Sequence, residues 1–132
     1  MEYQHSELTG QIIAAAIEVH KQLGNGFQEL IFHKALTIEL NSRNIKSENE
    51  VSIPVYYKEI QIGYRRVDFL VDKAVCVEIK ALSQLENQHL AQALNYLEAL
   101  NLEIGLLINF GASKLEIKRL YNKKYKPNIT TK

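Results

Sequence analysis

The first forty residues place apolar side chains at helical spacing. One face of a helix is marked by Leu8, Ile12, Ile13, Ala16, Val19 and Leu23. Ser6 or Thr9 could cap its start, and the glycines of residues 24–26 end it. A second helix is predicted from about residue 27 to residue 42, and its expected inward side chains are Phe27, Ile31, Ala35 and Ile38.

The period then changes to two, which is typical of strands. Val51, Ile53, Val55 and Tyr57 predict a first strand, in which Pro54 requires an edge or a bulge because proline donates no ladder hydrogen bond. Residues 58–59 form the expected turn into a second strand that begins at Ile60. Apolar residues have even numbers over 60–64 and odd numbers over 67–71, so a bulge or bend is expected near Arg65 and Arg66.

The second half of the chain predicts a strand, a helix and two further strands. The third strand spans 75–79, and Ser83-x-x-Glu86 has the pattern of a capping box that opens a helix. The inward stripe of this helix should consist of Leu90, Ala93, Leu94 and Leu97. Residues 104–110 are apolar on both faces, as in a covered interior strand, and the last strand runs from 115 to 121.

The predicted order is therefore ααβββαββ, an α/β fold in which helices flank a mixed sheet and residues 75–110 form a parallel crossover. A length of 132 residues without repeats or linkers predicts a single domain over 1–132 with a basic tail at about 122–132. Residues 114–132 hold seven basic side chains against Glu116, a net charge of +6, which leaves −5 for residues 1–113. Such a tail is compatible with phosphate binding, and a solvated tail is the commoner explanation.

Composition narrows the class of protein. Hydrophobic residues make up 46% and charged residues 23%, which is ordinary for a globular protein. The one cysteine, Cys76, excludes an internal disulfide. There is no signal-peptide pattern and no apolar run long enough to span a bilayer, so a cytoplasmic location and no membrane partner are expected.

The hairpin of the second and third strands brings two carboxylates and a lysine together. A three-residue turn at 72–74 puts residue 71 opposite 75 and 69 opposite 77, so Asp68 lies opposite Glu78 with Cβ atoms about 5 Å apart. Lys80 points to the same side, two residues beyond Glu78. Two carboxylates this close repel each other, and a divalent cation such as magnesium would relieve the repulsion. The alternative is an exposed ion-pair cluster of little energetic value.

Several motifs in order along the chain carry a family resemblance. They are Gly26-Phe27-Gln28-Glu29, Asp68, Glu78-Ile79-Lys80, His89-x-x-Gln92 and Gln92-x-x-x-Tyr96, with Gly105-Leu106-Leu107-Ile108-Asn109-Phe110 after them. In this order the chain resembles the PD-(D/E)xK nucleases, and more narrowly the bacterial GxxExxY proteins of that superfamily. Two positions depart from the pattern: Phe32 stands where the family name implies tyrosine, and Val67 replaces the proline before Asp68.

The resemblance implies a restriction-endonuclease-like core and a nuclease that hydrolyses phosphodiester bonds with Mg²⁺ or Mn²⁺. It implies metal binding by Asp68, Glu78, the Ile79 carbonyl and Glu29, with catalytic roles for Lys80 and Gln92. Candidate phosphate contacts are Arg65, Arg66, His89 and Tyr96. The expected partner is nucleic acid, DNA before RNA, with a homodimer as a further expectation.

Two other functions stay open at this point. The chain could be a catalytically silent nuclease-fold module that binds nucleic acid or a protein partner through its basic C-terminal segment. It could also be a structural or regulatory protein that binds no metal. Metal-dependent cleavage that needs Asp68 and Lys80 separates the first reading from the other two.

Overall fold

A computed structural model describes residues 5–127 of the chain, which form three helices and five strands. The elements are α1 (Ser6–Leu23), α2 (Glu29–Ser42), β1 (Ser47–Tyr57), β2 (Ile60–Val71), β3 (Val75–Lys80), α3 (Asn87–Leu100), β4 (Ile104–Asn109) and β5 (Glu116–Tyr121). The predicted order ααβββαββ is confirmed. None of the helices over 5–127 has the length and hydropathy needed to cross a membrane.

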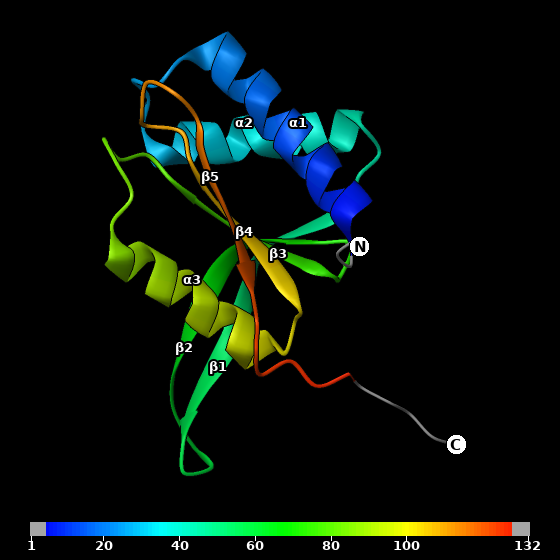
Figure 1. The fold of residues 1–132 in the computed structure, drawn as a ribbon, viewed down its shortest axis with the longest axis vertical. Helices are drawn as coiled ribbons and strands as arrows, with labels where there is room; N and C mark the ends of the chain where they lie inside the picture. Colours follow the sequence, from blue (N-terminus) through cyan, green and yellow to red (C-terminus); the bar gives the residue numbers. More distant parts are fainter. Residues whose placement is uncertain (1–4, 128–132) are drawn as a thin grey trace.

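The five strands make one mixed sheet in the order β1-β2-β3-β4-β5 (Figure 1). Only β3 and β4 are parallel, and α3 connects them, which is the predicted crossover. The other neighbours are antiparallel. Pro54 lies in β1, an edge strand, as a residue without an N–H donor requires.

Helices α1 and α2 cover one face of the sheet, where they bury the larger core. This core joins Ile12 and Ala16 of α1 to Phe69, Val77 and other inward residues of β2, β3 and β4. On α2 the buried residues are Phe32, Leu36 and Leu40. Of the predicted stripe, Ala35 packs against this core, whereas Phe27, Ile31 and Ile38 are exposed, so the prediction was wrong for these three. The helix turns its other apolar face inward, so hydrophobic spacing alone did not identify the buried side.

Helix α3 covers the opposite face with a smaller core. Its Tyr96 and Leu97 pack with Ile53, Val67 and Cys76. Gly105 allows this close packing, because a Cβ there would lie 2.8 Å from Leu97 Cδ2. The predicted interior strand is confirmed, since all six residues of β4 are buried.

The long β1–β2 hairpin departs from the prediction at its irregular point. Tyr57 pairs with Ile60 across the predicted turn at Lys58 and Glu59, both of which have positive φ. Val55 pairs with Gly63 and Tyr56 with Gln61, so the extra residue is Ile62. The expected bulge at residues 65–66 was wrong, because the β1–β2 register is continuous there.

Strand β2 nevertheless changes the face on which its apolar side chains are buried, and it does so at Asp68, just after the expected position at residues 65–66. Val67 packs in the core under α3, whereas Phe69, with the same parity, packs in the core under α1 and α2. Asp68 lies between them, and Glu50 of β1, which would face it in the register, has a φ of 54°. Regular alternation would place Val67 and Phe69 on one face of the sheet, so their burial on opposite faces shows that the strand twists at Asp68.

The loop after β3 is held by the buried side chain of Asn109. Its Oδ1 accepts hydrogen bonds from the N–H groups of Leu82 and Gly111, and its Nδ2 donates to Leu82 O and Glu116 Oε1. A Cβ at Gly111 would lie 2.4 Å from Leu82 N, so the two chain segments touch through their backbones. This network fixes the path of the chain that leaves Lys80.

The start of α3 also differs from the prediction. Its N-cap is Glu86, whose carboxylate accepts from the N3 backbone, while Glu86 N–H donates to His89 Nδ1 over 2.9 Å. The predicted capping box from Ser83 to Glu86 was therefore wrong by three residues. The reason is that a histidine ring can accept the hydrogen bond that the Ser-x-x-Glu pattern assigns to glutamate.

Candidate metal and phosphodiester site

The carboxylates of Asp68 and Glu78 meet where β2 and β3 separate. The predicted register is confirmed over Val71–Val75 and Phe69–Val77, and the ladder ends there. Beyond that point each carboxylate binds the other strand's backbone. Asp68 N–H donates to Glu78 Oε2, and Ile79 N–H donates to Asp68 Oδ2, both over 2.8 Å. The opening between the strands is thus held by the two acidic side chains.

Both carboxylates are at least partly shielded from water, and neither forms an ion pair within the described part of the chain. Glu78 is 7% exposed and Asp68 is half-buried. Burial first and then the charge of Asp68 raise the pKa of Glu78 from 4.5 to about 8. Burial also raises the pKa of Asp68, against the lowering effects of the Ile79 hydrogen bond, His33 and Lys80. Negative charge on both carboxylates is therefore only partly balanced by the protein, which favours the binding of a proton or a cation.

Lys80 and Glu29 extend the site at the edge of β3 and at the start of α2. Lys80 is half-buried, and its charge lowers the pKa values of Asp68, Glu78 and Glu29. Glu29 is the first residue of α2 and lies at the solvent-facing rim. Partial burial and then Asp68 raise the pKa of Glu29. Each of these charged groups acts on the pKa of at least one of the others, so four predicted site residues lie in one neighbourhood: Asp68, Glu78, Lys80 and Glu29.

Helix α3 contributes Tyr96 to this neighbourhood, but it leaves Gln92 at the surface. Tyr96 is 8% exposed, and its pKa is raised by burial, then by Glu78, while Arg65 acts in the opposite direction. Gln92 is exposed and makes no hydrogen bond to Asp68 or Glu78 among residues 5–127. Tyr96 packs with Val67 and Cys76, near neighbours of Asp68 and Glu78 along β2 and β3, so it lies near the carboxylate pair, whereas Gln92 is at the surface.

Two other predicted phosphate contacts have structural partners. His89 uses Nδ1 to cap α3, so only its Nε2 is left for a ligand. Arg66 lies 3.8 Å from Glu50, and both side chains are well exposed. An exposed pair of this kind is weak, so Arg66 can exchange this partner for phosphate at little cost.

Two residues that were not predicted for the site, His33 and Glu50, act on the pKa of Asp68. His33 follows Glu29 by one helical turn and stacks on Phe69 with ring centroids 4.4 Å apart. Its Nε2 is buried and has no hydrogen-bond partner within residues 5–127. Glu50 raises the pKa of Asp68, and His33 lowers it. The i, i+4 spacing from Glu29 was the one signal available for His33.

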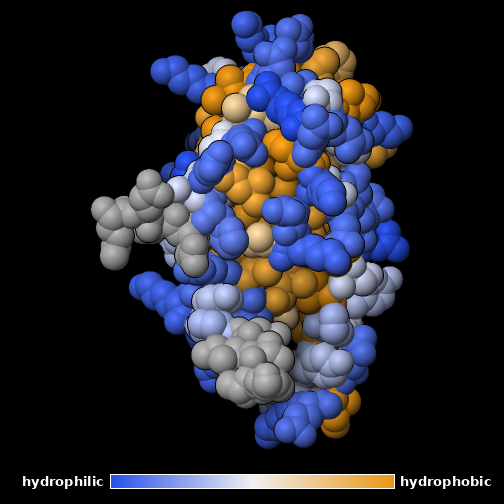
Figure 2. Space-filling view, turned by 90° about the vertical axis from the view of Figure 1, so that its right-hand side faces the viewer, coloured by the Kyte–Doolittle hydropathy of each residue, from blue (hydrophilic) through white to orange (hydrophobic). Residues whose placement is uncertain are grey.

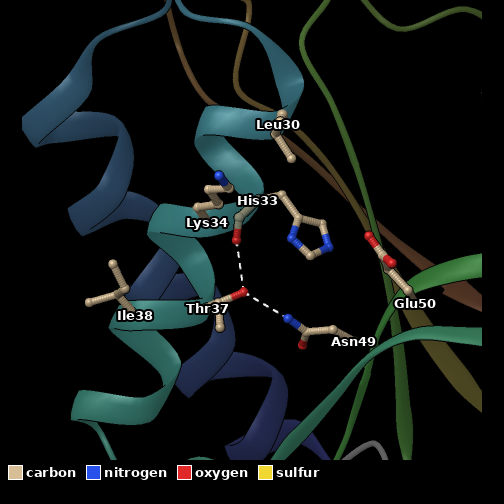
Figure 3. A pocket seen from close by; sticks show the side chains of 7 residues that line it. All are labelled: Leu30, His33, Lys34, Thr37, Ile38, Asn49 and Glu50. Atoms are coloured by element: carbon tan, nitrogen blue, oxygen red, sulfur yellow. Dashed lines mark hydrogen bonds between the residues drawn. The ribbon is translucent and has the colours of Figure 1, made fainter.

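His33 and Glu50 line a groove between α2 and β1 with a volume of about 540 Å³ (Figure 3). The other lining residues are Leu30, Lys34, Thr37, Ile38 and Asn49. Asn49 Nδ2 donates to Thr37 Oγ1 over 3.0 Å, which joins β1 to α2 at the side of the groove. In Figure 3 the imidazole ring lies between α2 and the Glu50 carboxylate. The groove thus borders the carboxylate site.

The donor set suits a hard divalent cation. Asp68 Oδ1 and Glu78 Oε1 accept no hydrogen bond from residues 5–127, whereas the other oxygen of each carboxylate is occupied. Over the same residues there is no group of three or more His, Cys, Asp or Glu side chains that could hold a metal. Magnesium commonly binds through one or two carboxylates with water and substrate phosphate, so a pair is sufficient.

Comparison with known proteins assigns the class. Residues 6–120 match the model of the PD-(D/E)XK nuclease superfamily, so the chain belongs to this superfamily. No protein in the curated collection matches it. A solved structure described as "Crystal structure of SSO0001" is similar, with a TM-score of 0.59 and 18% sequence identity. The match covers 90% of this chain and 60% of that one, and at this identity it supports the fold alone.

Proposed function

We propose that the protein is a metal-dependent nuclease that hydrolyses phosphodiester bonds in DNA or RNA. The observation that carries this proposal is the carboxylate pair at the opening between β2 and β3. A purely structural pair would gain nothing from two carboxylates whose pKa values are both raised by burial, one of them also by the charge of the other. Within the superfamily we place the chain beside the GxxExxY proteins, on the residue pattern around Glu29.

Asp68 and Glu78 would hold the metal, with the Ile79 carbonyl as a further ligand. Glu29, predicted as one more ligand, forms no three-carboxylate group with them among residues 5–127, so it would act on the metal through a bound water. A bound Mg²⁺ or Mn²⁺ would supply an activated water and would neutralise charge on the phosphate. The carboxylates themselves are kept in position by backbone N–H groups of the opposite strand. Because both strands are anchored in the core, the pair needs little rearrangement to bind a cation.

Lys80 would hold a phosphate oxygen during the reaction. Its half-buried ammonium is close enough to lower the pKa values of both carboxylates, so it lies where a negative phosphate would approach them. Charge that develops on the phosphate is stabilised most by a donor already fixed in place. Tyr96 and Arg65 are next to the pair on the α3 side and could contact the neighbouring phosphate.

Cleavage assays test the proposal. Full-length protein is incubated with single- and double-stranded DNA and RNA in Mg²⁺ or Mn²⁺, and products are resolved on gels. Asp68→Asn and Lys80→Ala should each reduce the rate at least about 100-fold, by loss of metal binding and of charge stabilisation. The exposed turn lysine provides the control, because Lys73→Ala should leave the rate unchanged. Wild-type protein that cleaves none of these substrates with either metal would sink the proposal.

The alternative is a nuclease-fold module that binds nucleic acid without cutting it. Lys123, Lys124 and Lys126 support it, because all three are exposed and follow β5. In that case the triple Lys→Ala variant should weaken binding and flatten its salt dependence, and Asp68→Asn should have no effect.

A further inference from the structure

The outer part of the β1–β2 hairpin exposes large side chains that an isolated strand pair would normally avoid. These residues are Val55, Tyr56, Tyr57, Ile60, Ile62 and Tyr64, which are 37% to 68% exposed. In Figure 1 this part of the hairpin extends beyond α3. At the same end of the molecule in Figure 2, hydrophobic and hydrophilic residues stand side by side on the surface. Apolar surface gathered on a projecting hairpin indicates a binding site.

The charge of the hairpin favours a negatively charged occupant. Residues 55–66 contain Lys58, Arg65 and Arg66 against Glu59, a net charge of +2. A symmetric contact with a second copy would set like charges against each other. Phosphate groups would instead be attracted, and arginine binds them through its planar fork.

The hairpin leads directly into the carboxylate site. Arg65 precedes Asp68 by three residues on β2 and pairs with Ile53, which is buried under α3, so Arg65 lies on the α3 side of the strand. Arg66 is next to Glu50, which in turn acts on Asp68. Tyr64 precedes Asp68 by four residues on the same strand, a distance of about 13 Å. A strand of nucleic acid that touches Tyr64 therefore has a short path to Asp68.

Two tyrosines share one side of the hairpin. Tyr64 pairs with Pro54, and Tyr56 follows Pro54 by two residues, so both rings project from the same face. Both are more than half exposed, at 55% and 59%. Exposed aromatic rings of this kind stack on bases that are unpaired, because a duplex hides the faces of its bases.

We propose that the β1–β2 hairpin is a platform for single-stranded nucleic acid. Bases stack on Tyr56 and Tyr64, and Arg66, two residues after Tyr64 and on the same face of β2, contacts the phosphates that lead to Asp68. This inference rests on the proposed nuclease function and names its substrate class. The aliphatic side chains near the tip, Ile60 and Ile62, add apolar contact to sugars and bases.

Fluorescence anisotropy of a labelled DNA oligonucleotide of mixed sequence, in EDTA to prevent cleavage, tests the platform. The full-length chain should bind the single strand at least about tenfold more tightly than the duplex. Tyr64→Ala should weaken single-strand binding about tenfold, and Tyr64→Phe should restore it because the ring is kept. Tyr121→Ala, on the opposite edge strand, is the matched control and should bind as wild type.

Tyrosine emission gives a second measurement. The chain has no tryptophan, so single-stranded DNA should quench emission in the wild type and less so in a Tyr56→Ala/Tyr64→Ala variant. Equal affinity for single strand and duplex, or unchanged binding by the double variant, would overturn the platform. So would a dimer in sedimentation that the double variant dissolves, because the occupant would then be a second copy. If duplex cleavage still depends on Asp68, the nuclease proposal stands and this inference alone fails.

Discussion

At the scale of single residues, the carboxylate pair is costly to the folded state and favourable to a ligand. Glu78 is almost fully buried, and its closest charge is another carboxylate. Each group gains one backbone hydrogen bond, which offsets only part of the desolvation. The uncompensated part of this desolvation cost becomes smaller when the carboxylate pair binds a proton or a cation. Protons and metal should therefore compete for Asp68 and Glu78.

This competition predicts the pH dependence of stability. Between the usual glutamate pKa of 4.5 and about 8, the folded chain keeps a proton on Glu78 that the unfolded chain has released. The free energy of unfolding in EDTA should therefore fall as pH rises over this window, by up to about 1.4 kcal/mol per pH unit. Urea denaturation between pH 5 and pH 8 measures it.

The same series carries its control. Glu78→Gln cannot release the proton and should flatten the slope, whereas Glu7→Gln, an exposed carboxylate on α1, should leave the slope as in wild type. A wild-type curve that rises over this window, or a slope that Glu78→Gln does not change, would show that Glu78 is not a protonated buried group.

At the scale of elements, strand pairing was predictable and helix orientation was less so. The β2–β3 register followed from parity and a three-residue turn, both of which are local. The inward face of α2 was missed because Ile31 and Ile38 also form an apolar stripe, and only packing against α1 and the sheet selects Phe32 and Leu36. The bulge at Ile62 was missed because parity places the change between residues 64 and 67, whereas the apolar residues at the actual bulge, Ile60 and Ile62, are exposed and reveal no buried face.

Asn109, the last residue of β4, uses its side chain to hold the loop between β3 and α3. Asn109→Ala removes four hydrogen bonds to groups on the loop and on β5. Buried donors and acceptors left without partners cost about 1–3 kcal/mol each, so unfolding free energy should fall by at least about 2 kcal/mol. Chemical denaturation checks this, with the exposed Asn41→Ala of α2 as the control. A loss no greater than that of the control would show that the loop is held by other contacts.

At the scale of the whole molecule, the sequence predicted the centre of the site better than its surroundings. Asp68, Glu78 and Lys80 belong to one hairpin, so their arrangement followed from local rules. Glu50 acts on the pKa of Asp68 because it faces that residue in the β1–β2 register, and His33 does so because α2 packs on Phe69 of β2, a long-range contact. Gln92 was expected at the site from the family pattern, and the orientation of α3 leaves it at the rim.

The most direct test of the account is a calorimetric titration of the metal-free protein with Mn²⁺ at pH 7.5. We predict one site per chain, lost in Asp68→Asn, which keeps an oxygen to accept the Ile79 N–H while removing the charge. Glu48→Gln, an exposed substitution on β1, should bind as wild type. Absence of binding, or binding that Asp68→Asn leaves unchanged, would contradict a metal site at the carboxylate pair.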